Sequence, residues 1–297
     1  MSTGTSELPN GFRFDNTEPE EVQVMRDWAI AEGWNPGLND LDLAYGFEPE
    51  AFIALRHGDE LVGGGTIISY GDSFGFMGMF IVAPQFRGAG FGELLWRHRL
   101  AILKSRLSPE ATIGMDGVYA MQQFYERGGF KFSHRDLRFE GLLQADCSSQ
   151  IGAVVVGRDL SDVAIEAICR LDHNEWGISR SDLLRSWLRA PDVVVARIGT
   201  EVSPEGIAVL RPCERGWRFG PVIADGIDAA RVLVATSTQG LSGQQVQFDI
   251  PEFNRVGLEL AAELGLEVSF GCARMYHGPM PERPGPRAIG VMSFEFG

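Results

Sequence analysis

Residues 79–96 contain the most informative pattern of the chain, Met79-Phe-Ile-Val-Ala-Pro-Gln-Phe-Arg87-Gly88-Ala89-Gly90-Phe91-Gly92-Glu-Leu-Leu-Trp96. An apolar run over residues 76–82 predicts a buried strand, and apolar residues at helical spacing after the glycines predict an amphipathic helix. The first backbone N–H groups of such a helix have no intrahelical partner, and the helix dipole adds partial positive charge. Glycines let a phosphate come close to these groups. The stretch therefore predicts a site for a phosphorylated cofactor.

The spacing of the glycines separates three classes of cofactor. A phosphate-binding P-loop needs Lys-Ser or Lys-Thr after its last glycine, whereas Glu93-Leu94 follows here. A dinucleotide fingerprint needs G-x-G-x-x-G and an acidic residue about 20 residues further on, whereas these glycines run G-x-G-x-G. Arg87-x-x-Gly90-x-Gly92 after a strand instead resembles the pyrophosphate loop of the GNAT acetyltransferases, which bind acetyl-CoA. A glycine-rich turn that serves only packing is the alternative for so short a pattern.

A second segment, Phe124-Tyr125-Glu126-Arg127-Gly128-Gly129-Phe130, resembles the F-Y-E-x-x-G-F motif of the same family. The resemblance implies that Tyr125 lies near the CoA sulfur and protonates the leaving thiolate, a role that suits a neutral phenol. A half-buried tyrosine that only packs against the sheet is the alternative. Many relatives carry an asparagine seven residues before this tyrosine, where this chain has Val118, so one polar contact to the cofactor is expected to be absent or replaced.

The expected elements follow the order β-α-α-β-β-β-α-β-α-β over residues 10–140, which is the order of the GNAT fold. A polar stretch at residues 144–150 predicts a linker, and a second series of similar order follows it. In that series the counterpart of the cofactor turn has no G-x-G, and Asp225 stands where its carboxylate is expected to cap the helix. The second half therefore resembles the degenerate domain of tandem GNAT proteins.

We therefore predict an α/β (α+β) protein with two tandem GNAT-like domains, each a mixed, mostly antiparallel sheet flanked by helices. The expected domains are residues 1–143, which bind acetyl-CoA, and residues 150–297, which do not. The turn Trp34-Asn35-Pro36-Gly37 and the segment Arg274-Met275-Tyr276-x-Gly278 also resemble the tandem subgroup.

The resemblance further assigns candidate site residues. The cofactor pyrophosphate is expected on the backbone N–H groups of the loop, and the pantetheine arm on the strand before it. These cofactor-binding residues are Phe80, Ile81, Val82, Arg87, Gly88, Ala89, Gly90, Phe91 and Gly92, together with Tyr125. N–H groups near Phe80 are expected to polarise the thioester carbonyl.

The general base is harder to assign from the sequence. Asp116, at the end of the next strand, is the candidate, and His57 and Glu32 are weaker alternatives. A cluster of Asp249, Glu252 and Asn254 at a strand-to-helix junction is predicted to wall the acceptor pocket, with helix capping as the alternative reading.

Composition bounds the remaining possibilities. The net charge of −14 argues against nonspecific binding to nucleic acid or anionic membrane, and no apolar run approaches the length of about 20 residues that spans a bilayer. The polar residues 1–14 contain no signal-peptide region, which predicts a cytoplasmic location. Four cysteines lie far apart in the sequence, so neither a metal site nor a disulfide is expected. The chain is expected to be a monomer or a homodimer.

The sequence is consistent with two functional hypotheses. The first is an N-acetyltransferase that moves the acetyl group of acetyl-CoA, as co-substrate, to the primary amine of a small molecule or amino-acid-like acceptor. The alternative is a non-catalytic acyl-CoA sensor or interaction protein that uses the fold without turnover.

Overall fold

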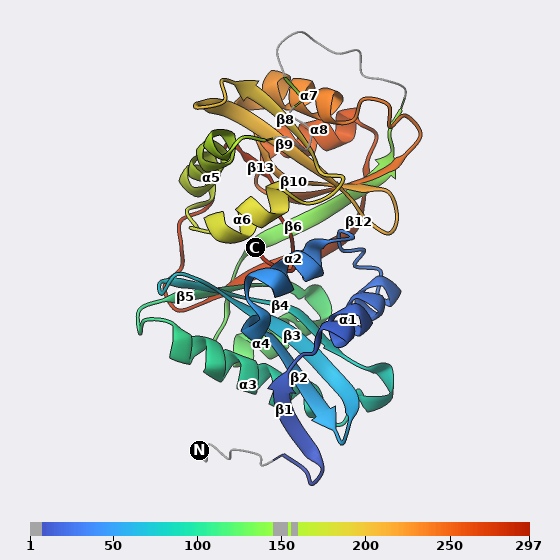
Figure 1. The fold of residues 1–297 in the computed structure, drawn as a ribbon, viewed down its shortest axis with the longest axis vertical. Helices are drawn as coiled ribbons and strands as arrows, with labels where there is room; N and C mark the ends of the chain where they lie inside the picture. Colours follow the sequence, from blue (N-terminus) through green and yellow to red (C-terminus); the bar gives the residue numbers. More distant parts are fainter. Residues whose placement is uncertain (1–7, 145–153, 156–159) are drawn as a thin grey trace.

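The computed structural model describes residues 8–144, 154–155 and 160–297 (Figure 1). In this part of the chain one sheet of 13 strands runs through the molecule, with helices packed on its faces. The elements of the first half are β1 (Phe12–Asn16), α1 (Pro19–Ala31), α2 (Asp40–Phe47), β2 (Phe52–His57), β3 (Glu60–Tyr70), β4 (Phe74–Val82), α3 (Phe91–Arg106), β5 (Thr112–Val118), α4 (Gln122–Arg127) and β6 (Lys131–Leu142). Those of the second half are β7 (Val154–Val155), α5 (Asp162–Trp176), α6 (Ser181–Leu188), β8 (Val194–Gly199), β9 (Pro204–Pro212), β10 (Trp217–Ile223), α7 (Gly226–Ser237), β11 (Gln245–Pro251), α8 (Arg255–Glu263), β12 (Glu267–His277) and β13 (Ala288–Gly290).

The two halves repeat the predicted order of elements, and the second half adds β13 at its end. They also share strands, which the sequence did not predict. The order across the sheet is β1-β2-β3-β4-β5-β12-β6-β11-β10-β9-β8-β7. Thus β12 of the second half lies between β5 and β6, and β6 of the first half lies between β12 and β11, across the middle of the molecule (Figure 1).

We call this sharing of β6 and β12 between the halves the strand exchange. At each of these two strands a buried Asp–Arg ion pair joins the halves, and the two pairs have the same arrangement. Asp116 of β5 lies opposite Arg274 of β12, with 2.6 Å between the carboxylate and the guanidinium. Asp249 of β11 lies opposite Arg138 of β6, with a contact of 2.7 Å. Removing one partner of such a pair leaves a buried charge without its counter-ion and costs about 3–5 kcal/mol, so either loss would destabilise the pairing of the shared strands.

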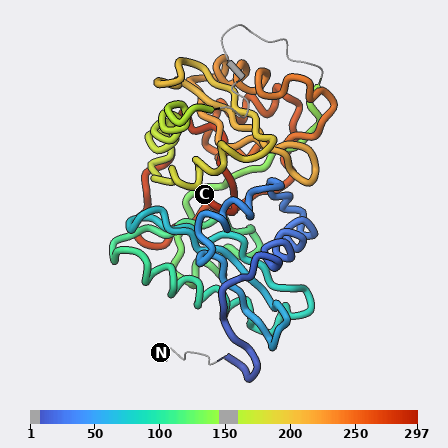
Figure 2. Tube along the Cα trace, in the orientation of Figure 1, coloured from blue at the N-terminus to red at the C-terminus, as the bar shows by residue number. Residues whose placement is uncertain are grey.

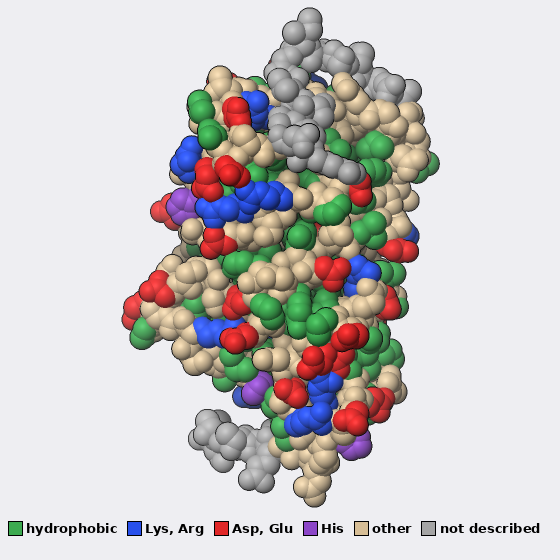
Figure 3. Space-filling view, in the orientation of Figure 1, with side chains coloured by type: hydrophobic (Ala, Val, Ile, Leu, Met, Phe, Trp, Pro, Cys, Tyr) green, Lys and Arg blue, Asp and Glu red, His purple; other side chains and the backbone are tan. Residues whose placement is uncertain are grey.

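Apolar packing is also continuous between the halves. One core cluster contains Met25 of α1, Leu184 and Trp187 of α6, and Phe296 near the end of the described chain. Residues 288–297 end between the two halves (Figure 2). On the face drawn in Figure 3, acidic and basic side chains lie in small mixed groups. None of the described helices is both long and apolar enough to cross a membrane.

Some details of the helix ends differ from expectation. The sequence predicts Thr17 as the N-cap of the first helix and Ser161 as the N-cap of a helix in the second half. The N-cap of α1 is instead Glu18, in a capping box with Glu21, whereas Ser161 caps α5 as predicted. The pattern Ser179-x-x-Asp182 predicts a further capping box. Ser179 does not cap α6, whose N-cap is Arg180, because the helix begins at Ser181.

Two further expectations concern the linker and the last strand. The sequence predicts a closing strand over residues 289–296. The strand found there is β13 alone, because the chain leaves the sheet after Gly290. The predicted linker lies outside the described residues except for Gln144.

Candidate active site

The site begins where two parallel strands separate. β4 pairs with β5 only from Phe74–Phe76 to Thr112–Gly114, and the strands then diverge. Opposite β3, the register of β4 shifts between Gly64 and Thr66, and Met79 takes a positive φ of 43°, which marks a bulge. Beyond Phe76 the edge of β4 that faces β5 is therefore free of strand pairing in the described chain.

The glycine loop follows directly and has the predicted conformation. Gly88 and Gly90 have φ of 78° and 87°, a region that a side chain disfavours, and α3 begins at Phe91. The backbone N–H groups of residues 88–92 have no hydrogen-bond partner among the described residues, and no side chain caps α3. Such a row of free N–H groups at a helix N-terminus fits an anion.

Arg87 fixes the position of this loop. Its Nε donates to the carbonyl of Val82 at 2.8 Å, and its Nη2 donates to Glu32 of the segment after α1 at 2.7 Å. Glu32, a weak candidate for the general base, is thus an ion-pair partner of the loop. His57, the other weak candidate, stacks on Phe12 at 4.4 Å and does not line the cavity described next.

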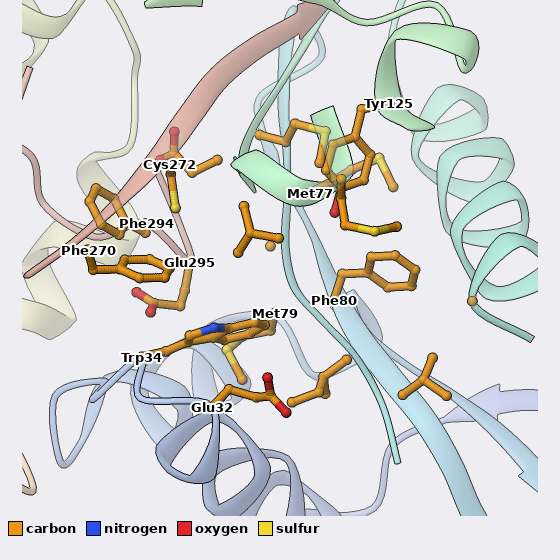
Figure 4. Close-up of a pocket in the computed structure, with 18 of the residues that line it drawn as sticks. Glu32, Trp34, Met77, Met79, Phe80, Tyr125, Phe270, Cys272, Phe294 and Glu295 are labelled. Carbon is orange, nitrogen blue, oxygen red and sulfur yellow. The ribbon is translucent and has the colours of Figure 1, made fainter. Parts of the chain in front are cut away.

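A cavity of about 470 Å³ extends from the glycine loop into the space between β4 and β5 (Figure 4). Of the predicted site residues, Phe80, Ile81, Val82, Arg87, Gly88, Gly92, Asp116 and Tyr125 line it. The other predicted residues, Ala89, Gly90 and Phe91, belong to the loop without lining the cavity, and the ring of Phe91 stacks on Phe12 at 4.5 Å. The remaining lining residues are Trp34, Glu32, Met77, Gly78, Met79, Met115, Val118, Met121, Phe270, Cys272, Phe294 and Glu295.

Tyr125 is buried at one side of the cavity, near Met77 and Phe80 (Figure 4). Its ring packs against Gly117 so closely that a Cβ there would lie 2.5 Å from the ring. Burial raises the pKa of Tyr125 to about 12, with the nearby cation of Arg99 acting in the opposite direction. The phenol is therefore protonated at neutral pH and can donate a proton.

Asp116 has a raised pKa in spite of its ion pair. Burial raises the pKa of Asp116 to about 7, Arg274 lowers it, and the neighbouring carboxyl of Asp136 raises it again. Asp136 is fully buried, and its two side-chain oxygens accept no hydrogen bond from the described residues. A second carboxyl group nearby disfavours the charged form of Asp116.

The equivalent aspartate of the second half titrates in the opposite direction. Burial also disfavours the charge of Asp249, but the guanidinium groups of Arg138 and Arg218 outweigh it and lower its pKa. The same Asp–Arg geometry thus gives a permanent anion at Asp249 and a group that titrates near neutral pH at Asp116.

The second half contributes to the cavity, but through residues that sequence reasoning missed. Phe270 and Cys272 come from β12, and Phe294 and Glu295 from the segment after β13. Asp249, Glu252 and Asn254, predicted to wall the acceptor pocket, do not line it. Asn254 instead caps α8 by accepting from the N–H of Gly257 at 2.9 Å, which is the alternative reading. Strand exchange explains the difference, since no local pattern shows that β12 pairs with β5.

The corresponding space of the second half is filled by the chain itself. β10 and β11 pair only from residues 217–219 to 246–248, as β4 and β5 do, but β13 then pairs with β10. A Cβ on Gly220 would lie 2.2 Å from the carbonyl oxygen of Val291. Asp225 is the N-cap of α7 but, contrary to expectation, its side chain makes no capping hydrogen bond. Residues 288–292 thus occupy the place where the first half has its cavity.

Two family models match the chain: the acetyltransferase (GNAT) family at residues 15–130 and the acetyltransferase (GNAT) domain at residues 168–286. The chain therefore belongs to the GNAT family and contains two GNAT domains in tandem. These matches confirm the predicted fold class and family. Because proteins of this family transfer acyl groups from acyl-CoA, the chain is an acyl-transfer enzyme by family.

Individual relatives agree with this assignment. The holothin acyltransferase of a Pseudoalteromonas species is 26% identical over 279 residues, which cover 94% of this chain and 92% of that protein. The crystal structure of a Pyrococcus horikoshii protein described as a candidate acetyltransferase has a TM-score of 0.81 at 20% identity, covering 99% of this chain and 98% of the other. A tandem GNAT protein from the clavulanic acid biosynthesis pathway has a TM-score of 0.64 at 16% identity, covering 91% of this chain and 100% of the other.

Proposed function

We propose that this protein transfers the acetyl group of acetyl-CoA to the primary amine of a small molecule, by direct attack of the amine on the thioester. One observation carries the proposal. A single cavity runs from the free N–H groups of the glycine loop to Tyr125 and Asp116. One end of the cavity, at the glycine loop, can therefore bind an anion, and the other end offers a proton donor, Tyr125, and a proton acceptor, Asp116.

The loop and β4 hold the cofactor in this proposal. The N–H groups of residues 88–92 bind the pyrophosphate, and the free edge of β4 at Phe80, Ile81 and Val82 pairs with the pantetheine arm. A second hollow between α3 and α4 carries Arg97, Lys104 and Arg127, which supply positive charge for the nucleotide end. Val118 presents an apolar side chain to the cavity, so the arm is bound through backbone groups and apolar contacts.

Three groups around the thioester have separate roles in this proposal: one polarises the carbonyl, one accepts a proton and one donates a proton. The N–H groups at the bulge of β4 polarise the thioester carbonyl. Asp116, with its pKa near neutrality, accepts a proton from the attacking amine, and a base of that pKa suits this task. Tyr125 donates a proton to the departing thiolate. The curated relative supports the acyl-transfer part of the proposal, and holothin is one acceptor to include in a screen.

The experiment has two arms. Thermal unfolding with and without acetyl-CoA tests the cofactor, because a ligand at 100 times its dissociation constant adds about 2.7 kcal/mol of stability. Release of free CoA thiol, measured over a panel of primary amines, tests transfer. A thermal shift without thiol release on any amine would favour the non-catalytic sensor. No shift with acetyl-CoA, and none with longer acyl-CoAs, would overturn the proposal.

A further inference from the structure

We propose that the acceptor is a primary aliphatic amine that carries a flat apolar ring on a short chain, with the ammonium group bound by Glu295 and the ring enclosed by Trp34, Phe270 and Phe294. This inference rests on the proposed function and names its acceptor class. It follows from the part of the cavity opposite Tyr125, where residues of both halves meet (Figure 4).

Three aromatic side chains from separate parts of the chain face this part of the cavity. Trp34 comes from the turn after α1, Phe270 from β12, and Phe294 from the segment after β13. Figure 4 shows the three rings around the carboxylate of Glu295, on the side away from Tyr125 and Met77. Rings gathered in this way offer flat apolar surfaces that an aromatic or similarly flat acceptor can contact face-on or edge-on.

The aromatic walls are held in place before any ligand arrives. The guanidinium of Arg138 lies 5.6 Å from the ring centre of Phe270 and 4.9 Å from that of Phe294. The same side chain donates to the carbonyl of Trp34 and is fixed by Asp249. Arg218 also donates to the carbonyl of Trp34, at 2.8 Å. A preformed site of this kind loses little conformational entropy on binding.

Glu295 supplies a carboxylate beside these rings and close to the site of transfer. The residue is buried, with 4% exposure. Its Oε2 accepts from the hydroxyl of Ser293 and lies 3.7 Å from Arg218, whereas its Oε1 has no hydrogen bond to any described residue. A Cβ on Gly78 would lie only 1.8 Å from the backbone oxygen of Glu295, so this residue rests on the bulge of β4. A bound ammonium would thus lie next to the strand that polarises the thioester.

The other charges of the cavity disfavour amino-acid and polyamine acceptors. Among the described lining residues the one basic side chain is Arg87, which is already bound to Glu32, so an acceptor carboxylate would find no free cation. Asp116 is held by Arg274 at 2.6 Å, whereas Glu295 lies 3.7 Å from Arg218 through its Oε2 and has no hydrogen bond to a described residue at its Oε1. One carboxylate of this kind and three aromatic rings match an aliphatic monoamine with one ring better than a polyamine.

Direct binding measurements on the full-length protein test this inference. Titration calorimetry would compare 2-phenylethylamine with butylamine, which lacks the ring, and with 2-phenylethanol, which lacks the amine. We expect 2-phenylethylamine to bind about tenfold more tightly than either, the difference expected for one charged hydrogen bond or one ring contact. Acetyl-CoA titrated in parallel reports on the proposed function separately.

Two variants test which residues cause the preference for the amine and the preference for the ring. Glu295→Gln should remove the preference for 2-phenylethylamine over 2-phenylethanol, and Phe294→Leu should reduce the preference over butylamine. Glu282→Gln, an exposed carboxylate of the same part of the chain, is the matched control and should change neither. An unchanged acetyl-CoA affinity in each variant shows that it is folded.

The outcomes separate this inference from the proposed function. If acetyl-CoA binds and thiol release is faster with butylamine or spermidine than with 2-phenylethylamine, the acceptor class is wrong and the proposed function stands. If 2-phenylethylamine binds as predicted but acetyl-CoA does not, the proposed function fails and the ring-and-carboxylate site stands. Equal binding of all three probes would overturn the inference.

Discussion

Tyr125→Phe removes one phenol oxygen and keeps the ring that packs against Gly117. We expect kcat to fall by about a hundredfold or more, because a positioned proton donor typically contributes that much. The dissociation constant of acetyl-CoA should not change. Steady-state thiol release and thermal shift measure the two quantities. Tyr119→Phe, whose side chain is 43% exposed, is the matched control. An unchanged kcat would leave Tyr125 as a packing residue.

The pH dependence of kcat tests Asp116. A base must be deprotonated to accept a proton, so kcat at saturating substrates should rise with pH through about 7, the pKa to which burial raises Asp116. No alkaline decline is expected from Tyr125, because its pKa of about 12 keeps the phenol protonated. A pH profile measured by thiol release checks both statements.

Asp136→Asn sharpens this test without breaking the ion pair of Asp116 with Arg274. The Asp136 carboxyl raises the pKa of Asp116, so its replacement should move the rising limb of kcat to lower pH. Glu252→Gln, a carboxylate outside the cavity, should leave the limb in place. If the limb does not move in Asp136→Asn, Asp116 is not the group that titrates.

Among the helices and loops, the glycine loop before α3 has a counterpart in the second half, at the start of α7. Matched variants at the two places test which of them binds the cofactor. Gly90 is the N-cap of α3 and Gly226 is the first residue of α7, with φ of 87° and 85° and with open space where a Cβ would lie. A glutamate at either position should cost about 1–2 kcal/mol of backbone strain. We expect Gly90→Glu to abolish the thermal shift caused by acetyl-CoA, and Gly226→Glu to lower the melting temperature while keeping that shift. Loss of the shift in both variants would contradict this assignment.

The filled space of the second half sets the stoichiometry of cofactor binding. Residues 288–292 cover the bulge at Gly220, and β13 pairs with the edge of β10 that a pantetheine arm would need. Titration calorimetry should therefore give one acetyl-CoA per chain. Two sites per chain would mean that β13 moves aside, and the assignment of a single cofactor site would be wrong.

Most elements could be predicted because their signals are local. The run over residues 76–82, the glycines after it and the apolar spacing of α3 sufficed for the strand, the turn and the helix. Capping was predicted less well. Ser161 caps α5, but Ser179 lies before the N-cap of α6, and Asp225 lies at the N-cap of α7 without a capping hydrogen bond from its side chain. Capping needs both the right position in the turn and a side chain that reaches the free backbone N–H groups.

At the scale of the whole molecule, the sequence could not show which strands are neighbours. The apolar patterns of β6 and β12 predict strands and say nothing of their partners. The half of the cavity built on Phe80, Asp116 and Tyr125 was therefore predictable, because it lies within one repeat. The half built on Phe270 and Glu295 was not, because it depends on the exchange of strands.

The exchange itself predicts that the two halves do not fold separately. A fragment of residues 1–143 lacks β12, which lies between β5 and β6, and it leaves Asp116 buried without Arg274. It also loses Arg138's partner Asp249 and the apolar packing of Met25 against the second half. Each buried charge that loses its partner lowers the free energy of unfolding by about 3–5 kcal/mol, which is comparable to the whole stability of a small domain. We expect the fragment to aggregate or to unfold without cooperativity, and to give no thermal shift with acetyl-CoA. Coexpression with residues 150–297 should restore a complex that binds acetyl-CoA, because the exchanged strands can pair between two chains. Cooperative unfolding of the fragment alone, with acetyl-CoA affinity equal to that of the full chain, would mean that β12 is dispensable to the first half.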